Sequence, residues 1–222
     1  MSNFSINSFK KILKNYPGKK ISKTLVFRGI FLSNKYALNH PTDSLYSYKR
    51  GARFNYPNIF PALYFSFSVI AASMELAQVT NPLCTVFKNS DFREIVNFPL
   101  EIEGNFVDLR DPILNFDLKH PEYQIDTSVW QAAISNGNLA ITHEIGQAIY
   151  NQGFDGIIYH SFQAFKRNFH GLNEEESLCG CIFMSTSDFL KPKNSGCAVL
   201  CFDDSLFNML SKHTRNPENE KA

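Results

Sequence analysis

The feature that most constrains this fold is a short β-rich run followed at once by a nearly apolar helix. Residues 62–67 have the pattern of a strand, and Ser68 then offers the side chain of a good helix N-cap. The predicted helix over residues 69–79 is rich in alanine, methionine and leucine, and Asn81-Pro82 stops it. This composition indicates a helix buried in the core.

The rest of the chain alternates between short strands and a few helices. Further strands are predicted at residues 24–30, 84–87, 105–109, 156–159 and 179–184, with a less regular stretch between the second and third. Helices are predicted at residues 8–15, 128–135 and 142–152, the last capped by Thr142 and closed by Gly153 in a left-handed conformation. Without a strict βαβ rhythm, we expect an α+β fold: a single compact domain of short mixed strands with flanking helices.

A length of 222 residues suits one domain. We divide the chain into a basic helical extension (1–23), a main domain (24–210) and a disordered tail (211–222). The extension holds six lysines and no acidic residue. Its amphipathic helix is expected to cover the domain; a membrane-surface role is the alternative, weakened by the shortness of the helix.

The chain has 22 basic and 21 acidic residues and no basic stripe, so its net charge does not predict a partner. We therefore expect no direct binding to nucleic acid. The sequence also lacks a membrane span and the apolar core of a signal peptide, which favours the cytoplasm. The five cysteines fit reduced, packed thiols, and their spacing argues against zinc, so no metal site is expected.

Familiar catalytic motifs are absent. The chain carries no GxGxxG, P-loop, HExxH or GxSxG motif, which excludes dinucleotide reductases, P-loop enzymes, zincins and ordinary α/β hydrolases. His160 and Ser161 are adjacent, but neighbours on an extended chain point to opposite faces, so they are not interpreted as a base and nucleophile.

Four polar residues stand where a structural role is awkward. Arg28 follows Phe27 in an apolar strand, and Glu75 is the only charged residue of the apolar helix. Arg53 and Asn55 lie in a loop that is suited to presenting side chains. A purely structural Arg28–Glu75 ion pair explains the first two as well as a functional site does.

These residues lie in four segments that resemble, in order, a RES domain. The segments are Val26–Gly29, Gly51–Asn55, Leu63–Glu75 and Gly153–Ser161, within a region of similarity from residue 24 to 184. The chain departs from the family at one point. Members of the family commonly carry an asparagine shortly before the last apolar strand, whereas this chain has the run Leu178–Phe183 there, without an asparagine.

The resemblance implies a fold like that of ADP-ribosyltransferase toxins and an enzyme that cleaves the nicotinamide–ribose bond of NAD. It implies that Arg28, Tyr64, Glu75 and Ser161 are catalytic, and that Phe27, Arg28, Arg53, Asn55, Tyr64 and Ser161 bind NAD. Arginines suit the pyrophosphate, Tyr64 the nicotinamide ring, and Glu75 the oxocarbenium-like ribose. Ser161 is expected to bond a phosphate or ribose and not to act as a nucleophile.

The same resemblance implies a toxin of a toxin–antitoxin pair. NAD is then a substrate, water or inorganic phosphate is the acceptor, and no resident cofactor is needed. A cognate antitoxin is the implied partner, within a homodimer or a toxin–antitoxin hetero-oligomer. Two alternatives stay open: a mono-ADP-ribosyltransferase that modifies a protein, and a binding module without turnover.

Overall fold

The computed structural model describes residues 5–39, 42–80, 95–114, 127–161, 175–184 and 200–201. Its helices are α1 (Ile6–Leu13), α2 (Lys35–Asn39), α3 (Leu45–Arg50), α4 (Val69–Thr80), α5 (Thr127–Ser135) and α6 (Ile141–Asn151). Its strands are β1 (Lys19–Phe31), β2 (Ala62–Ser66), β3 (Ile95–Asp108), β4 (Gly156–His160), β5 (Leu178–Phe183) and β6 (Leu200–Cys201). This is the α+β class that the sequence predicts.

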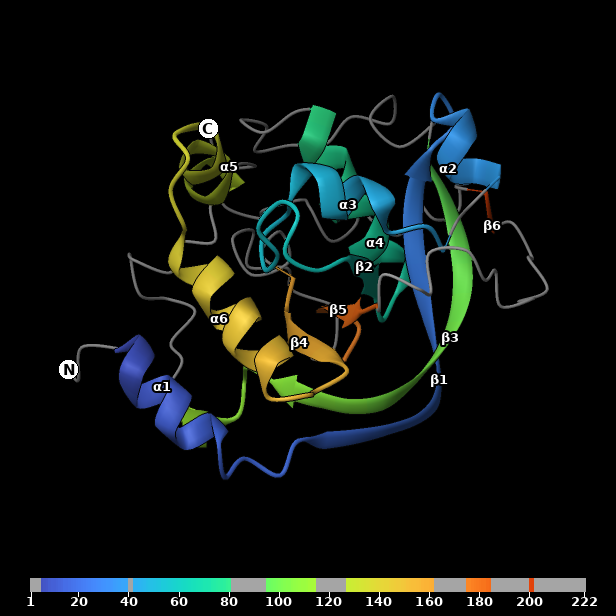
Figure 1. Cartoon of the computed structure of the whole chain (residues 1–222). Helices are drawn as coiled ribbons and strands as arrows, with labels where there is room; N and C mark the ends of the chain where they lie inside the picture. The colour runs from blue at the N-terminus through green and yellow to red at the C-terminus, as the bar shows by residue number, and fades with distance from the viewer. Residues whose placement is uncertain are drawn as a thin grey trace, which may run out of the picture.

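The strands pair in a closed ring. Their order is β1-β2-β5-β4-β3, β3 pairs again with β1, and β6 is added beside the start of β3. Within the ring only β3 and β4 are parallel. Figure 1 shows β1 and β3 running together and bending around one side of the molecule. Their register shifts between Ile21 and Thr24, which is the kind of irregularity that bends a strand.

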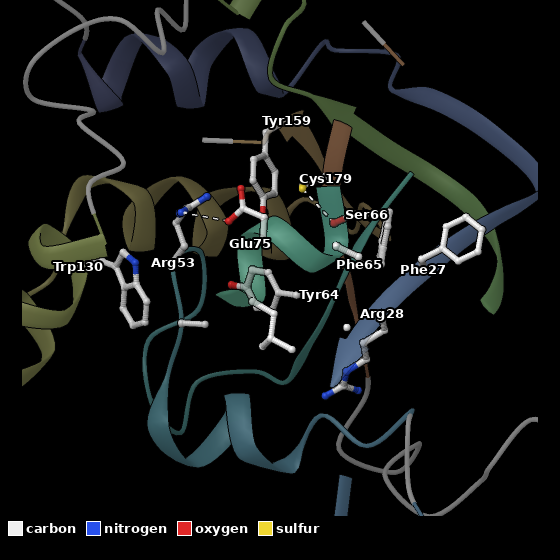
Figure 2. Close-up of a pocket in the computed structure, with 14 residues that line it drawn as sticks. Phe27, Arg28, Arg53, Tyr64, Phe65, Ser66, Glu75, Trp130, Tyr159 and Cys179 are labelled. Atoms are coloured by element: carbon white, nitrogen blue, oxygen red, sulfur yellow. Dashed lines mark hydrogen bonds and ion pairs between the residues drawn. The ribbon is translucent and has the colours of Figure 1, made fainter. Parts of the chain in front are cut away.

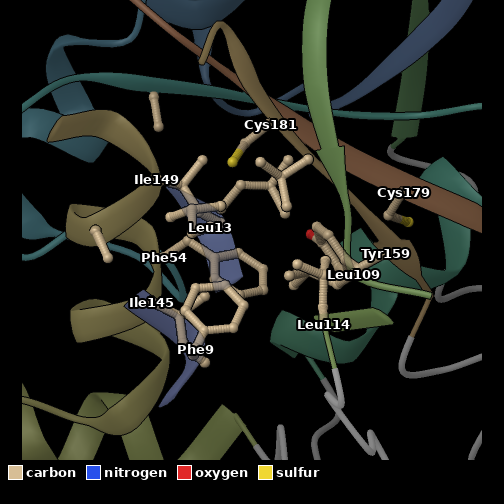
Figure 3. Close-up of a cluster of buried hydrophobic side chains, with 14 of the residues drawn as sticks. Phe9, Leu13, Phe54, Leu109, Leu114, Ile145, Ile149, Tyr159, Cys179 and Cys181 are labelled. Carbon is tan, nitrogen blue, oxygen red and sulfur yellow. The ribbon is translucent and has the colours of Figure 1, made fainter. Parts of the chain in front are cut away.

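Alternation along the strands places apolar side chains on both faces of the sheet, where they form two large clusters; a smaller third cluster joins Ile30, Val96 and Phe98. All five strands of the ring contribute to an inner cluster, for example through Val26, Phe65, Leu100, Ile158 and Leu178. The next residue along a strand points to the other face. There, α1 and α6 cover the sheet in a second cluster, shown in Figure 3.

The amphipathic helix α1 belongs to that outer core. Phe9 and Leu13 are each about 1% exposed, and they share the cluster with Ile145 and Ile149 of α6. The structure therefore confirms that this helix covers the domain.

Two strands are longer than predicted. β1 begins at Lys19 instead of Thr24. β3 begins at Ile95, so residues 95–104, the part of the less regular stretch that the structure describes, are strand. Pro99 and the exposed Glu101 and Glu103 obscured the pattern of β3, although Leu100 and Ile102 between them are buried. Pairing along the length of β1 overrides these weak local preferences.

The helix ends agree with the sequence in part. Ser68 caps α4 by accepting a hydrogen bond from the Ala71 amide (3.0 Å), and Gly153 has a φ of 80° after α6, both as predicted. The prediction that Thr142 caps α6 is wrong, because the helix begins at Ile141 and its N-cap residue is Ala140. The His143 ring satisfies the Ala140 amide instead.

Some predictions lie outside the described residues, namely the strand at 84–87 and the tail at 211–222. Within the described part of the chain, none of the helices has the length and apolar character needed to span a membrane. Cys179 and Cys181 are buried free thiols.

Candidate active site

A cleft of about 290 Å³ lies over β1, β2 and α4 and contains most of the predicted site. Phe27, Arg28, Arg53, Tyr64 and Glu75 all line it, although they come from four different segments. Its volume is near the lower limit of about 300–1,000 Å³ that is usual for ligand pockets. In Figure 2, Glu75 and Tyr64 lie in the middle of the cleft.

The Glu75 carboxylate is held at both oxygens. Ser161 donates a hydrogen bond of 2.5 Å to Oε1, and Arg53 Nη2 lies 4.0 Å from Oε2. The Glu75 side chain keeps 22% of its exposure, whereas Ser161 is fully buried. The carboxylate therefore faces the cleft in a fixed orientation, and Ser161 holds it by a hydrogen bond from the buried side.

Arg53 lies over an aromatic ring. Its guanidinium carbon is 5.6 Å from the centre of the Tyr159 ring, and its side chain is 7% exposed. Such stacking suits the flat guanidinium, which also needs an anion when it is buried. Tyr159 and Glu75 together fix where this positive charge sits.

The turn that carries Arg53 is held by side chains on both sides. The Tyr64 hydroxyl accepts a hydrogen bond from the Phe54 amide and donates one to Asn55 Oδ1, both 2.9 Å long. Asn55 Nδ2 in turn donates to the Ser47 carbonyl (2.7 Å). Burial raises the pKa of Tyr64 well above its ordinary value, so the hydroxyl keeps the proton that it donates.

Helix α6 supports the same turn through His143 and Gly146. His143 Nδ1 accepts from the Ala140 amide (3.0 Å), so Nε2 carries the proton and donates to the Ala52 carbonyl (3.0 Å). Burial lowers the pKa of His143 to about 4, which keeps the ring neutral. One turn later, a Cβ on Gly146 would overlap the Phe54 carbonyl, so only glycine allows this approach.

Arg28 lies at the other end of the cleft. Its Nη1 donates to the Asp43 carbonyl (2.9 Å), and burial lowers the pKa of Arg28 to about 10 while Asp43 opposes that shift. Figure 2 shows its guanidinium pointing away from Glu75. The Arg28–Glu75 ion pair that the sequence left open is not formed, since the arginine facing Glu75 is Arg53.

Two predicted site residues do not line the cleft. Asn55 and Ser161 are each 0% exposed, and they act on lining residues, Asn55 on Tyr64 and Ser161 on Glu75. The structure thus brings all seven predicted residues into one region and separates them into a lining layer and a supporting layer.

Sequence reasoning missed other lining residues, including Tyr159, Trp130 and Cys179. Side chains two residues apart in a strand lie on the same face, so the prediction of Ser161 could have led to Tyr159, two residues earlier. Nothing local marks Trp130. Cys179 lies 3.1 Å from Ser66 through its sulfur, and burial raises the pKa of its thiol, so it is unsuited to act as a nucleophile.

Among the described residues, no group of three or more histidines, cysteines or acidic residues could hold a metal ion.

Comparison with known proteins gives matches to a protein family and to solved structures. No curated protein matches the chain. A crystal structure of the M. tuberculosis MbcT–MbcA toxin–antitoxin complex contains a similar chain, with a TM-score of 0.55 and 11% identity, covering 94% of this chain and 100% of that one. That likeness shows a shared fold. The RES domain matches residues 27–176, well over half of the sequence, and the chain therefore belongs to the RES-domain family.

Proposed function

We propose that this chain is a toxin-like enzyme that consumes NAD by cleaving its nicotinamide–ribose bond. The observation that carries the proposal is the Glu75 carboxylate, which Ser161 and Arg53 hold in a cleft that also contains Arg28 and Tyr64. A fixed carboxylate in a partly buried cleft suits a reaction that develops positive charge. Membership of the RES family supports the same chemistry.

The reaction moves a positive charge from the nicotinamide ring to the ribose. The bond between the anomeric carbon and the ring nitrogen breaks, and nicotinamide leaves with the electron pair. The ribose then carries an oxocarbenium-like charge, which the nearby Glu75 carboxylate stabilises. Water adds to the anomeric carbon and loses a proton, which yields ADP-ribose. If inorganic phosphate adds instead, the product is ADP-ribose that carries a phosphate on the same anomeric carbon.

The remaining residues bind and orient the substrate. Arg28 is the anchor for the pyrophosphate, because a guanidinium can bind phosphate oxygens in pairs. Arg53 faces Glu75, so we assign it first to holding the carboxylate and second to binding phosphate. Tyr64 offers its ring to nicotinamide, and Phe27 forms part of the wall. Ser161 and Asn55 support Glu75 and Tyr64.

We further propose that the chain pairs with a cognate antitoxin protein. The support is the shared fold with a chain of a toxin–antitoxin complex. An enzyme that destroys a cofactor needed by its own cell requires such control.

The direct test mixes purified protein with NAD and follows free nicotinamide with and without inorganic phosphate. We expect nicotinamide release with no label transferred from NAD to protein, and the effect of phosphate identifies the acceptor. Label on a protein would replace the proposal with a mono-ADP-ribosyltransferase. Binding of NAD without release of nicotinamide would indicate a binding module.

A test in cells follows NAD within minutes of induction in bacteria. Because free NAD is shared by all metabolism, its pool should fall before growth stops, and Glu75→Gln should prevent both effects. Growth arrest at a constant NAD pool would contradict hydrolysis and favour protein modification, in which each target consumes one cofactor.

A further inference from the structure

Trp130 of α5 forms one wall of the cleft and has a polar atom in need of an acceptor. The residue lines the cavity together with Ala52 and Arg53. Its indole Nε1 is buried, and no acceptor for it is found among the described residues. A buried N–H without an acceptor is unfavourable, and a ligand in the cleft can supply one.

The two ends of the cleft carry different side chains. In Figure 2, Trp130 and Arg28 lie at its two ends, with Glu75 and Tyr64 between them. If Glu75 acts at the anomeric carbon, the two groups attached to that ribose leave it on opposite sides. The pyrophosphate goes to the guanidinium of Arg28, which leaves the end with Trp130 for the nicotinamide.

The chemistry of the indole fits this leaving group. The nicotinamide ring of oxidised NAD is a cation, and tryptophan is the aromatic side chain that attracts cations most strongly. The ring also carries a carboxamide oxygen, which can accept from Nε1–H. Tyr64 cannot make that contact as readily, because its hydroxyl already serves Phe54 and Asn55.

We propose that Trp130 completes the leaving-group subsite to which Tyr64 also belongs: the indole packs against the cationic pyridinium, and its Nε1–H, which lies in the plane of the indole, donates to the carboxamide oxygen. This inference rests on the proposed cleavage of NAD. It implies that the site prefers oxidised over reduced dinucleotide, since reduction removes the charge on the ring.

The chain contains a single tryptophan, so its fluorescence reports on Trp130 alone. The experiment uses full-length Glu75→Gln protein, which should bind NAD without consuming it, and calorimetry measures binding in parallel. We expect NAD to quench the fluorescence to saturation over the range of its binding curve. ADP-ribose, which lacks the ring, should bind without quenching.

Two variants separate the ring from the N–H in the otherwise wild-type protein. Trp130→Phe keeps an aromatic face, and we expect the KM for NAD to rise about fivefold. Trp130→Leu loses both contacts, and a rise of about thirtyfold is expected. In both, kcat should change less than KM, because the ring is most cationic before the bond breaks. A merely structural tryptophan would lower stability and kcat together.

Tyr46→Leu is the matched control, because Tyr46 is 75% exposed and lies outside the cleft. Binding of NAD without quenching, or an unchanged KM in Trp130→Leu, would overturn the subsite while leaving the proposed function intact. If calorimetry detects no NAD binding and the wild-type protein releases no nicotinamide, the proposed function itself fails and the subsite with it.

Discussion

The two ends of the cleft hold their arginines in different ways. The turn around Arg53 is fixed by Tyr64, by Asn55 and by helix α6, so its backbone has little freedom. Arg28 extends from β1, where its guanidinium meets the carbonyl of Asp43 in the connection between α2 and α3.

The difference follows the chemistry assigned to each end. A carboxylate that stabilises a short-lived cation must already be in place when the bond breaks, so its support has to be rigid. A group that binds phosphate can adjust as the ligand arrives. Three predictions test whether the Arg53 end sets the rate and the Arg28 end sets binding, and a fourth tests how His143 stabilises the Arg53 turn.

The largest effect is expected from Glu75→Gln. The change keeps size and the hydrogen bond from Ser161 but removes the charge that opposes the oxocarbenium, so kcat should fall about a thousandfold. Nicotinamide release measures it, and thermal unfolding should show an unchanged fold. Glu144→Gln on α6, a carboxylate outside the cleft, is the control. Near-normal turnover would remove Glu75 from the site.

Gly146→Ala breaks the rigid end without touching any residue that lines the cleft. The new methyl group would overlap the Phe54 carbonyl and push the Arg53 turn out of place. We expect a loss of about 1–3 kcal/mol in the free energy of unfolding and a fall of about a hundredfold or less in kcat.

Gln147→Ala, at the next position of α6, controls for adding alanine to this helix. If Gly146→Ala kept full kcat despite lower stability, the position of the turn would not limit the reaction.

Arg28→Lys tests the adaptable end. Lysine keeps the positive charge and loses the fork that binds two phosphate oxygens, so KM for NAD should rise about tenfold with a smaller change in kcat. Arg50→Lys, at the exposed end of α3, is the control. A fall confined to kcat would assign Arg28 to the chemical step.

The smallest effect is a dependence on pH through His143. Its pKa falls from 6.5 when unfolded to about 4 when folded, because burial disfavours the charged ring. The stability it contributes is therefore complete above pH 6.5 and is lost as the pH falls toward 4. Urea unfolding measures the free energy of unfolding at pH 7 and at pH 5. Between these two pH values His143→Gln should lose less of that free energy than the wild-type protein, and an equal loss would point to other titrating groups.

The sequence predicted the parts of this molecule whose signals are local. The period of β2, the cap at Ser68 and the apolar character of α4 are written in adjacent residues, so these elements were placed correctly. β3 was shortened because Pro99 and its charged neighbours resemble a loop, and only pairing with β1 makes them a strand.

The sequence predicted five of the residues that line the cleft, but not which of them pair with one another. Arg28 and Arg53 both stand near apolar segments, and no local rule decides which of them faces Glu75. The hydrogen bond from Ser161 joins residues 86 positions apart, and it depends on how β4 enters the ring. Trp130 was missed for the same reason, since α5 reaches the cleft only in the folded chain.

The closed ring of strands also determines when activity can begin. During synthesis the β1–β3 pairing cannot be complete until residue 106 has left the ribosome, and β5 can complete its pairing between β2 and β4 only after residue 183. Contacts so distant along the chain form slowly. A nascent chain that already contains Arg28, Arg53 and Glu75 would still lack Ser161 behind the carboxylate. On the proposed function, the growing polypeptide would therefore be inactive, and the proposed antitoxin would have the time between translation and folding in which to meet its partner.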